Sequence, residues 1–306
     1  MRIGIASIIA CILFVCLAGC VTEEPTMPPE ATADGLRSYV EAAAGYARGV
    51  ESATATAVFN DPESRLISGD WYIYAYDYEG VLLAHPYERE FVGTNRLGWT
   101  SPNGLEVIRL GRDTAAEGGG YILYMYPRPV QGQEINESAS SMYHLKLGYV
   151  TPVDNEWWIG SGLYFSDMEA GKMRDRVDDL VMLVDDAVDY AHANGTAAAL
   201  SAFSEGGNRF SEDDRYIFAL DYNGTVLAYR VDPGSVGKSH LGIVREYGVK
   251  SADASIEAAR NGGGFVVYGI KNPATGKVEQ KLSYVRPVDD TWWLGSGVYL
   301  SELLSV

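Results

Sequence analysis

Cysteine is scarce in this 306-residue chain. Its three cysteines, Cys11, Cys16 and Cys20, all lie within the first twenty residues. The remainder therefore has no thiolate for a metal site and no pair of cysteines for a disulfide. The stability of the folded part must come from core packing, for which a hydrophobic content of 47% is sufficient.

Positive charge is scarce as well. The chain has 24 Lys and Arg residues against 41 Asp and Glu residues, which gives a formal net charge of −17. This balance disfavours nucleic acid as a partner and gives no electrostatic attraction to anionic lipid. We expect an acidic, well-solvated surface.

Signs of catalysis are few. The four histidines have no spacing typical of a metal site. The Gly-Ser-Gly segments at residues 160–162 and 295–297 lack the G-x-S-x-G spacing of a nucleophile elbow. We expect no catalytic residue, no metal and no cofactor, although a hydrolase stays open as a third class that a clustered acid–base pair in the fold would reveal.

Long apolar runs are confined to the N-terminus. Arg2 precedes an apolar run from Ile3 to Ala18, and residues 17–20 read Leu-Ala-Gly-Cys. The run is short for a transmembrane helix and lies where signal peptides lie. Residues 17–20 look like a lipobox, the site at which bacterial and archaeal lipoproteins are cleaved and lipidated. We therefore predict a lipoprotein signal peptide at residues 1–20, a lipid on Cys20, a flexible tether at residues 21–35, and a folded part held at the extracytoplasmic face of the cell membrane.

One stretch of the chain occurs twice. Residues 149–164 read YVTPVDNEWWIGSGLY, and residues 284–299 read YVRPVDDTWWLGSGVY. Two near-copies of this length indicate a tandem duplication. We predict a first domain at residues 36–166 and a second at residues 167–306, the latter beginning with a connecting helix at residues 167–200.

Each copy shows the same succession of patterns. An amphipathic helix near residues 36–50 or 177–191 leads to a strand that turns back at Glu79-Gly80 or Asn223-Gly224. A short helix near residues 103–116 or 252–260 precedes a glycine-led strand and a closing hairpin. The first copy also has a polar insertion at residues 131–144. The order helix, strand, strand, helix, strand, strand, strand predicts an α+β fold with an antiparallel sheet.

The last strand of each copy carries two glycines between aromatic residues. Side chains alternate along a strand, so one face shows Trp158, Gly160, Gly162 and Tyr164. The two missing side chains leave a trough on that face. Two interpretations are open: a helix packs into the trough, or the trough forms the wall of a ligand pocket.

These segments together resemble the Cache family of extracytoplasmic sensor domains, of the single-Cache type. The resemblance lies in the long helix, in YIFALDYNGTVLA at residues 216–228, in Val-Gly-Lys at 236–238, in GGGFVVY at 262–268 and in the final strands at 281–299. It covers nearly the whole chain after the tether, twice. It implies two PAS-like domains, each a long N-terminal helix packed with an antiparallel sheet of five to six strands, with a pocket for a small molecule, often a carboxylate or an amino acid.

Cache domains usually belong to chemoreceptors or histidine kinases. In this chain we find no second membrane segment and no room for an output domain. We therefore expect it to pass a ligand, or a shape change set by the ligand, to a separate membrane receptor or transporter.

Two lysines are the leading candidates for binding an anion. A small carboxylate needs a cation and hydrogen-bond donors in an apolar cup. Lys146 and Lys281 hold the matching place in the two copies, and each is followed two positions later by a small residue, Gly148 or Ser283. The alternative is an edge-strand lysine that prevents aggregation.

Further candidates supply hydroxyl or basic groups. They are Tyr124, Tyr216, Tyr268, Tyr284, His85 and Arg230. For the tyrosines the alternative is a place in the core, and strict alternation puts Tyr284 on the opposite face from Lys281. For His85 the alternative is an exposed turn residue.

We predict from these patterns a lipid-anchored sensory or solute-binding protein whose ligand is a small organic acid or an amino acid. The second copy has additional basic residues at Arg215, Lys238 and Arg286. If only one copy binds an anion, we expect it to be the second. The alternative class is a structural or interaction protein of the cell surface whose pockets are closed.

Overall fold

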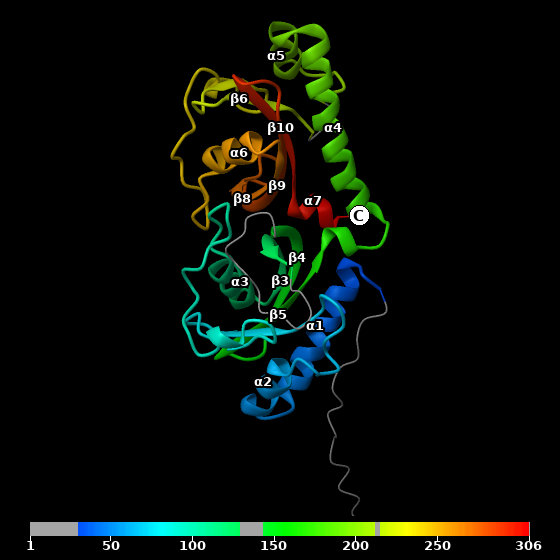
Figure 1. Ribbon diagram of the computed structural model, residues 1–306, viewed down its shortest axis with the longest axis vertical. Coiled ribbons are helices and arrows are strands. Elements are labelled where there is room, and N and C mark those ends of the chain that lie inside the picture. The colour runs from blue at the N-terminus through cyan, green and yellow to red at the C-terminus, as the bar shows by residue number, and fades with distance from the viewer. Residues whose placement is uncertain (1–29, 129–142, 212–214, 306) are drawn as a thin grey trace, which may run out of the picture.

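The computed structural model describes residues 30–128, 143–211 and 215–305 (Figure 1). The expected signal peptide, Cys20, most of the expected tether and residues 131–142 of the polar insertion lie outside the described residues. The described chain forms two lobes, one from each copy of the repeat. The first half runs from α1 to β5, and the second half runs from α4 to α7.

The first half begins with a long helix, as predicted. Helix α1 (Ala33–Arg48) starts at Thr32, whose side chain accepts a hydrogen bond from the backbone N–H of Gly35. Its buried stripe includes Leu36, Tyr39 and Val40. A second helix that the sequence patterns did not predict, α2 (Ser52–Asn60), follows it.

The second half repeats this arrangement. Helix α4 (Lys172–Asn194) ends at Gly195, whose φ of +83° a residue with a side chain rarely adopts, and α5 (Thr196–Ser204) begins directly after it. Each half then has a short helix before its third strand, α3 (Val107–Ala116) or α6 (Ser251–Arg260). The last described helix is α7 (Leu300–Leu304). Single turns of 3-10 helix within the described residues, η1 (Arg89–Phe91), η3 (Phe165–Asp167) and η4 (Pro233–Ser235), connect the larger elements.

Each half contains a five-stranded antiparallel sheet. The strands of the first are β1 (Tyr74–Asp77), β2 (Leu82–Ala84), β3 (Gly120–Pro127), β4 (Tyr143–Pro152) and β5 (Trp157–Tyr164), in the order β2-β1-β5-β4-β3. Those of the second are β6 (Phe218–Asp221), β7 (Val226–Tyr229), β8 (Gly264–Lys271), β9 (Val278–Pro287) and β10 (Trp292–Tyr299), in the order β7-β6-β10-β9-β8. The predicted α+β fold with two PAS-like sheets is confirmed.

Helices cover both faces of each sheet. Helix α1 packs on the face of β4 that bears Tyr149, whose hydroxyl donates to the Glu41 carboxylate of that helix at 2.8 Å. Helix α3 packs on the other face, where Gly111 lies against Trp158. Helices α4 and α6 cover the second sheet in the same way. The long helix and the glycine trough are therefore on opposite faces of the sheet.

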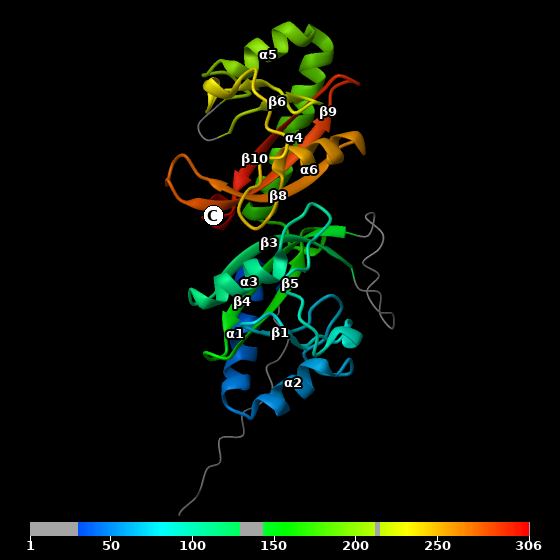
Figure 2. The ribbon, with the colours of Figure 1, turned by 90° about the vertical axis from the view of Figure 1, so that its left-hand side faces the viewer.

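The two sheets approach each other through equivalent edge strands, β3 and β8 (Figure 2). The side-chain amide of Gln280 accepts from the backbone N–H of Leu123 at 2.8 Å and donates to its carbonyl at 2.7 Å. Asn103 of the first half donates to the carbonyl of Val267 on β8 at 2.8 Å. These side-chain amides thus form hydrogen bonds with backbone N–H and C=O groups of the edge strands β3 and β8 that no neighbouring strand in the described residues pairs. Over the residues described, no helix combines the length and the apolar character required to cross a membrane.

Candidate ligand-binding site

Each sheet has a buried lysine at its centre. Lys281 lies on β9 between Tyr268 of β8 and Tyr299 of β10, and only 2% of it is exposed. Its ammonium donates to the Tyr216 hydroxyl at 2.6 Å and lies 4.5 Å from the centroid of that ring. Because β9 is an inner strand, the alternative of an edge-strand lysine is wrong for this residue. The same holds for Lys146 on β4, which is fully buried.

The glycine trough holds the stems of these lysines. A Cβ atom at Gly297 would lie 2.5 Å from Cε of Lys281, and one at Gly162 would lie 2.5 Å from Cε of Lys146. No helix fills the trough in the described chain: α1 and α4 pack on the opposite face, and the atoms nearest to the missing Cβ positions of Gly160 and Gly162 belong to strand side chains, Tyr74 and Lys146. The trough therefore forms part of the wall behind the cavity, and its glycines are needed for close approach of a neighbouring side chain.

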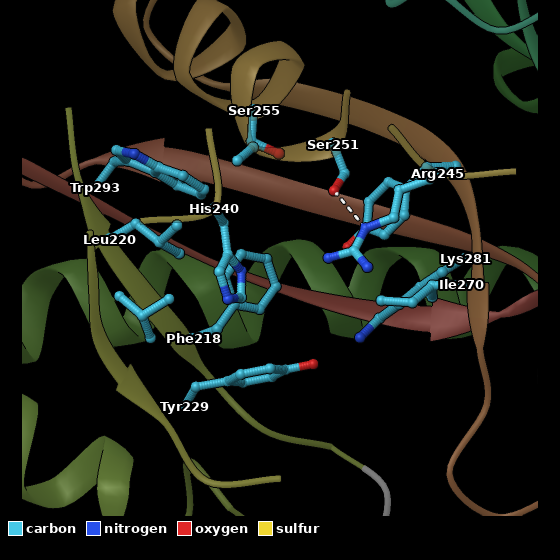
Figure 3. Close-up of a pocket in the computed structure, with 13 residues that line it drawn as sticks. Phe218, Leu220, Tyr229, His240, Arg245, Ser251, Ser255, Ile270, Lys281 and Trp293 are labelled. Carbon is cyan, nitrogen blue, oxygen red and sulfur yellow. Dashed lines mark hydrogen bonds between the residues drawn. The ribbon is translucent and has the colours of Figure 1, made fainter. Parts of the chain in front are cut away.

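A cavity with about 500 Å³ of free space, part of it open to solvent, lies in front of Lys281 (Figure 3). The strands contribute Phe218, Leu220, Val226, Tyr229, Tyr268, Ile270, Lys281 and Trp293, helix α6 contributes Ser251, Ala252 and Ser255, and the preceding loop contributes His240 and Arg245. Figure 3 shows the polar ends of Lys281, Arg245 and Tyr229 directed toward the same space. The cavity is mostly apolar, with a few convergent polar groups, as small-molecule sites are.

The electrostatics of this cavity favour an anion. Three basic side chains line it, and none of its lining residues is Asp or Glu. Arg245 donates through Nε to the Ser251 hydroxyl at 3.2 Å, and among the described residues no ion pair joins it to a carboxylate. Helix α6 begins at the cavity with Ser251, so the partial positive charge of a helix N-terminus adds to the field.

The buried position of the basic groups alters their protonation. Burial lowers the pKa of Lys281 to about 8, and Glu302 acts in the opposite direction. Burial also lowers the pKa of His240, and the neighbouring positive charge of Arg245 lowers it further. An anion in the cavity would favour the charged form of both groups.

The equivalent cavity of the first half is smaller, with about 340 Å³ of free space, and aromatic rings dominate its lining. Lys146 donates to the Tyr72 hydroxyl at 3.1 Å, and its ammonium lies 4.5 to 5.3 Å from the ring centroids of Tyr72, Tyr164 and Tyr126. Burial lowers the pKa of Lys146 to about 7, whereas the carboxylates of Asp70 and Glu88 act against that shift.

The first half also contains a buried carboxylate of its own. Glu88 is 1% exposed and accepts a hydrogen bond from the Tyr126 hydroxyl, which also lies 3.4 Å from Nε2 of His85. In the second half the positions of Tyr126 and Glu88 are taken by Ile270 and by Asp232, an exposed residue. The first half thus has a carboxylate in its interior, whereas the carboxylate that acts on Lys281 in the second half, Glu302 of α7, is only half-buried and does not line the cavity.

The structure brings most of the predicted residues together in two groups. Tyr216 and Tyr268 accompany Lys281 in the second half, and Tyr124 and His85 accompany Lys146 in the first. His85 is 2% exposed, so the alternative of an exposed turn residue is wrong for it.

Two predicted residues lie away from both cavities. The ring of Tyr284 packs against Phe265 on the face covered by α4, as strict alternation indicates. Arg230 lies beside Gly206, after the end of β7. Neither lines the cavity in front of Lys281.

The basic residues that favoured the second copy are not those that line its cavity. Arg286 pairs with Asp185 of α4 at 2.8 Å, and Arg215 and Lys238 are exposed. The cavity contains instead Arg245 and His240, which sequence reasoning missed because their loop has no periodicity. A position-by-position comparison of the copies could have found Arg245, since the first copy has Ser101 in its place.

The described residues contain no group of three or more His, Cys, Asp or Glu side chains placed to hold a metal ion.

Comparison with protein families gives two matches along this chain. The profile described as Single Cache domain 2 matches residues 46–176 and again residues 193–305. A curated relative, the sensor histidine kinase MctS of Rhizobium johnstonii, is 34% identical over 102 residues, which are 33% of this chain and 20% of that protein. The chain thus spans about a fifth of the length of this relative.

The chain also matches several solved structures at low sequence identity. A methyl-accepting chemotaxis protein from Vibrio parahaemolyticus is 22% identical with a TM-score of 0.37, covering 42% of this chain and 91% of that one. A Cache chemosensory domain studied for carboxylic acid recognition is 23% identical with a TM-score of 0.36, covering 42% and 95%. The ligand-binding domain of the Pseudomonas fluorescens chemoreceptor CtaA, in complex with L-alanine, is 13% identical with a TM-score of 0.27, covering 88% and 89%.

Replacing Lys281 by a neutral side chain of similar size should stabilise the ligand-free protein. Because burial lowers the pKa of Lys281 from 10.5 to about 8, the charged lysine destabilises the fold below pH 8. We expect Lys281→Met to raise the free energy of unfolding at pH 7 by on the order of 3 kcal/mol. The gain should shrink as the pH rises from 8 toward 10.5, since the wild-type lysine then loses its charge.

Chemical denaturation at pH 7, 9 and 10 measures this difference. Lys271→Met, at an exposed lysine that ends β8, is the matched control and should change stability little at any of these pH values. A less stable Lys281→Met protein at pH 7 would contradict the expected cost of the buried charge.

Proposed function

The chain belongs to the single Cache domain 2 family, and we propose that it is a non-catalytic extracytoplasmic sensor or solute-binding protein whose second half binds a small organic acid. The observation that carries this proposal is the cavity in front of Lys281, which three basic side chains line without any carboxylate. The argument has three steps, which concern the charge of the ligand, its chemical class and the choice between the two halves.

A ligand carboxylate supplies what the second cavity lacks. A buried charge is costly unless it is paired and hydrogen-bonded. The ammonium of Lys281 contacts a tyrosine hydroxyl and aromatic rings, and the carboxylate that acts on it, Glu302 of α7, does not line the cavity. A carboxylate between Lys281 and Arg245 would pair with both cations and accept further hydrogen bonds from the hydroxyls of Tyr229 or Tyr268. Its apolar part would contact Leu220, Val226 and the ring of Trp293.

The lining favours an acid without an amino group. An α-ammonium group needs an anionic or carbonyl acceptor, and no Asp or Glu side chain lines the cavity. It would also add a positive charge to a space that already holds the cations of Lys281 and Arg245. An amino acid should therefore bind more weakly than a simple or keto acid of the same size.

The first half is poorly suited to the same ligand. Its buried lysine already has the carboxylates of Asp70 and Glu88 nearby, and Tyr126 stands where the second half has the smaller Ile270. An exogenous carboxylate would have to compete there with one that is permanently present.

The place of the protein in the cell forms part of the proposal. The lipobox-like residues 17–20 support lipidation of Cys20, and the residues after it would link the folded part to the membrane. A separate membrane receptor or transporter would then receive the ligand or the change that the ligand causes.

Calorimetric titration of the purified protein with acetate, propionate and pyruvate should show one saturable site. We expect Lys281→Met to weaken binding about tenfold or more, since it removes one of the two main cations. The matched variant Lys146→Met should change the affinity less than about twofold. L-alanine should bind more weakly than propionate, which has the same carbon skeleton without the amino group.

The competing class, a structural surface protein with closed pockets, predicts no saturable heat and no rise in melting temperature with any of these acids. Equal losses in Lys281→Met and Lys146→Met would contradict the assignment to the second half.

The affinity for the acid should depend on pH in a way that identifies the lysine. A bound carboxylate favours charged Lys281, so the free protein must take up a proton when its lysine is neutral. Since the pKa of Lys281 is about 8, the affinity should be constant below pH 7 and fall about tenfold per unit above pH 8. Titrations at pH 8 in two buffers of different ionisation heat should show uptake of about half a proton.

If Lys146 were the binding lysine, the fall in affinity would begin one unit lower, because the pKa of that residue is about 7. The pH at which the affinity begins to fall therefore distinguishes the two halves independently of the substitutions.

Lipidation at Cys20 can be tested with an alkyne-bearing fatty acid fed to a bacterium that expresses the full chain. We expect the wild-type protein and the Cys16→Ser control to incorporate the label, because only Cys20 would remain after cleavage. Cys20→Ser should incorporate none. Equal labelling of Cys20→Ser and the wild type would refute the anchor.

A further inference from the structure

The segment that carries Arg245 turns back on itself at the boundary between the halves. The backbone N–H of Arg245 donates to the carbonyl of Val249 at 2.7 Å, and the backbone N–H of Gly248 donates to the carbonyl of Arg245 at 3.3 Å. Tyr247, at the tip of this turn, has a φ of +57° and is the only non-glycine residue with positive φ in the described ranges. A bulky residue in that conformation is strained, so its surroundings must hold it there.

The first half provides part of that support. The backbone N–H of Glu106 donates to the carbonyl of Tyr247 at 3.0 Å. A Cβ atom on Gly248 would lie 3.2 Å from the carbonyl oxygen of Gly104, so the tip of the turn is in direct contact with residues 104–106. Arg109, paired with Glu106 at 2.6 Å, places its guanidinium 5.9 Å from the ring centroid of Tyr247.

A second contact fixes the strand on which the turn rests. Asn103 donates to the carbonyl of Val267 on β8 at 2.8 Å, and its own side-chain oxygen accepts from the Ser101 hydroxyl at 2.5 Å. The turn also pairs with this strand through an antiparallel bridge between Glu246 and Gly269. Residues 244–250 are therefore held between β8 and residues 103–106 of the first half.

We propose that Asn103 and Glu106 are positioning residues, which act from the first half to keep the Arg245 guanidinium directed into the cavity of the second half. Neither residue lines that cavity, so they act through the turn Arg245–Val249. The first half thereby determines ligand recognition in the other half. The consequence for a ligand rests on the proposed function, whereas the placement of Arg245 does not.

This arrangement also links ligand binding to the contact between the halves. A ligand carboxylate that pairs with Arg245 would stabilise the same turn that Glu106 holds. By thermodynamic linkage, the factor by which a bound ligand strengthens the contact between the halves equals the factor by which that contact raises the affinity for the ligand.

The position of Arg245 can be measured without any ligand through the titration of His240. The positive charge of Arg245 lowers the pKa of His240, Asp232 acts in the opposite direction, and Lys281 lines the same cavity. Asn103→Leu removes the donor to Val267 without adding charge. Glu106→Pro removes the N–H donor to Tyr247, together with the carboxylate that pairs with Arg109, at a φ of −75° that proline adopts. We expect either variant to raise the pKa of His240, measured by NMR on histidine-labelled full-length protein and assigned with His240→Gln.

A double-mutant cycle separates positioning from general loosening. In the Arg245→Met background, the His240 pKa should already be raised, and Asn103→Leu should raise it no further. Gln280→Met, which loosens the boundary at Leu123 away from the turn, is the matched control and should leave the pKa of His240 unchanged. Hydrogen exchange at residues 244–250 should quicken in Asn103→Leu and Glu106→Pro.

An equal rise in the pKa of His240 with and without Arg245 would overturn the proposal, as would an unchanged pKa in both Asn103→Leu and Glu106→Pro. Failure of the protein to bind acetate or pyruvate would overturn the proposed function and leave this result standing, since no ligand enters the measurement.

Discussion

A lysine ammonium buried among aromatic rings is the constraint on which each half of this protein depends. The stems of Lys146 and Lys281 cross the middle of the sheet, and this is possible only because the neighbouring strand has glycine at residues 162 and 297. The charge is then held by a tyrosine hydroxyl and by ring faces, which stabilise a desolvated cation less than a carboxylate does. This one placement accounts for the glycines at 162 and 297 and for the tyrosine that each copy places beside its lysine, Tyr72 or Tyr216.

The two halves satisfy the same buried charge in different ways. The first half brings in the Glu88 carboxylate and fills the remaining space with Tyr126 and His85. The second half has Ile270 in place of Tyr126 and the exposed Asp232 in place of Glu88, and it places Arg245 and His240 around the same cavity as Lys281. The cavity of the second half is thus lined by cations without a carboxylate, whereas the first half has a carboxylate in its interior.

The sequence was sufficient for the fold and for part of the site. The repeated hairpin and the alternation of its strands predicted two antiparallel sheets, the face shared by the glycines and the separation of Tyr284 from Lys281. Helix α2 was missed because its Ala- and Thr-rich sequence has little amphipathic pattern. Arg245 was missed because its direction is set by a strained turn and by contacts with residues more than a hundred positions earlier, which no local pattern encodes.

The meeting of β3 with β8 has an evolutionary consequence. These strands are equivalent members of the two copies, and equivalent residues, Leu123 and Val267, receive the side-chain amides that join them. The side chains that join the strands are nevertheless not equivalent, since Gln280 reaches Leu123 from β9 and Asn103 reaches Val267 from the loop before α3. In a symmetric homodimer a substitution changes both sides of the contact, whereas in a tandem repeat each side can change alone. Position 103 can therefore be an asparagine while its equivalent, position 247, is a tyrosine in a strained turn.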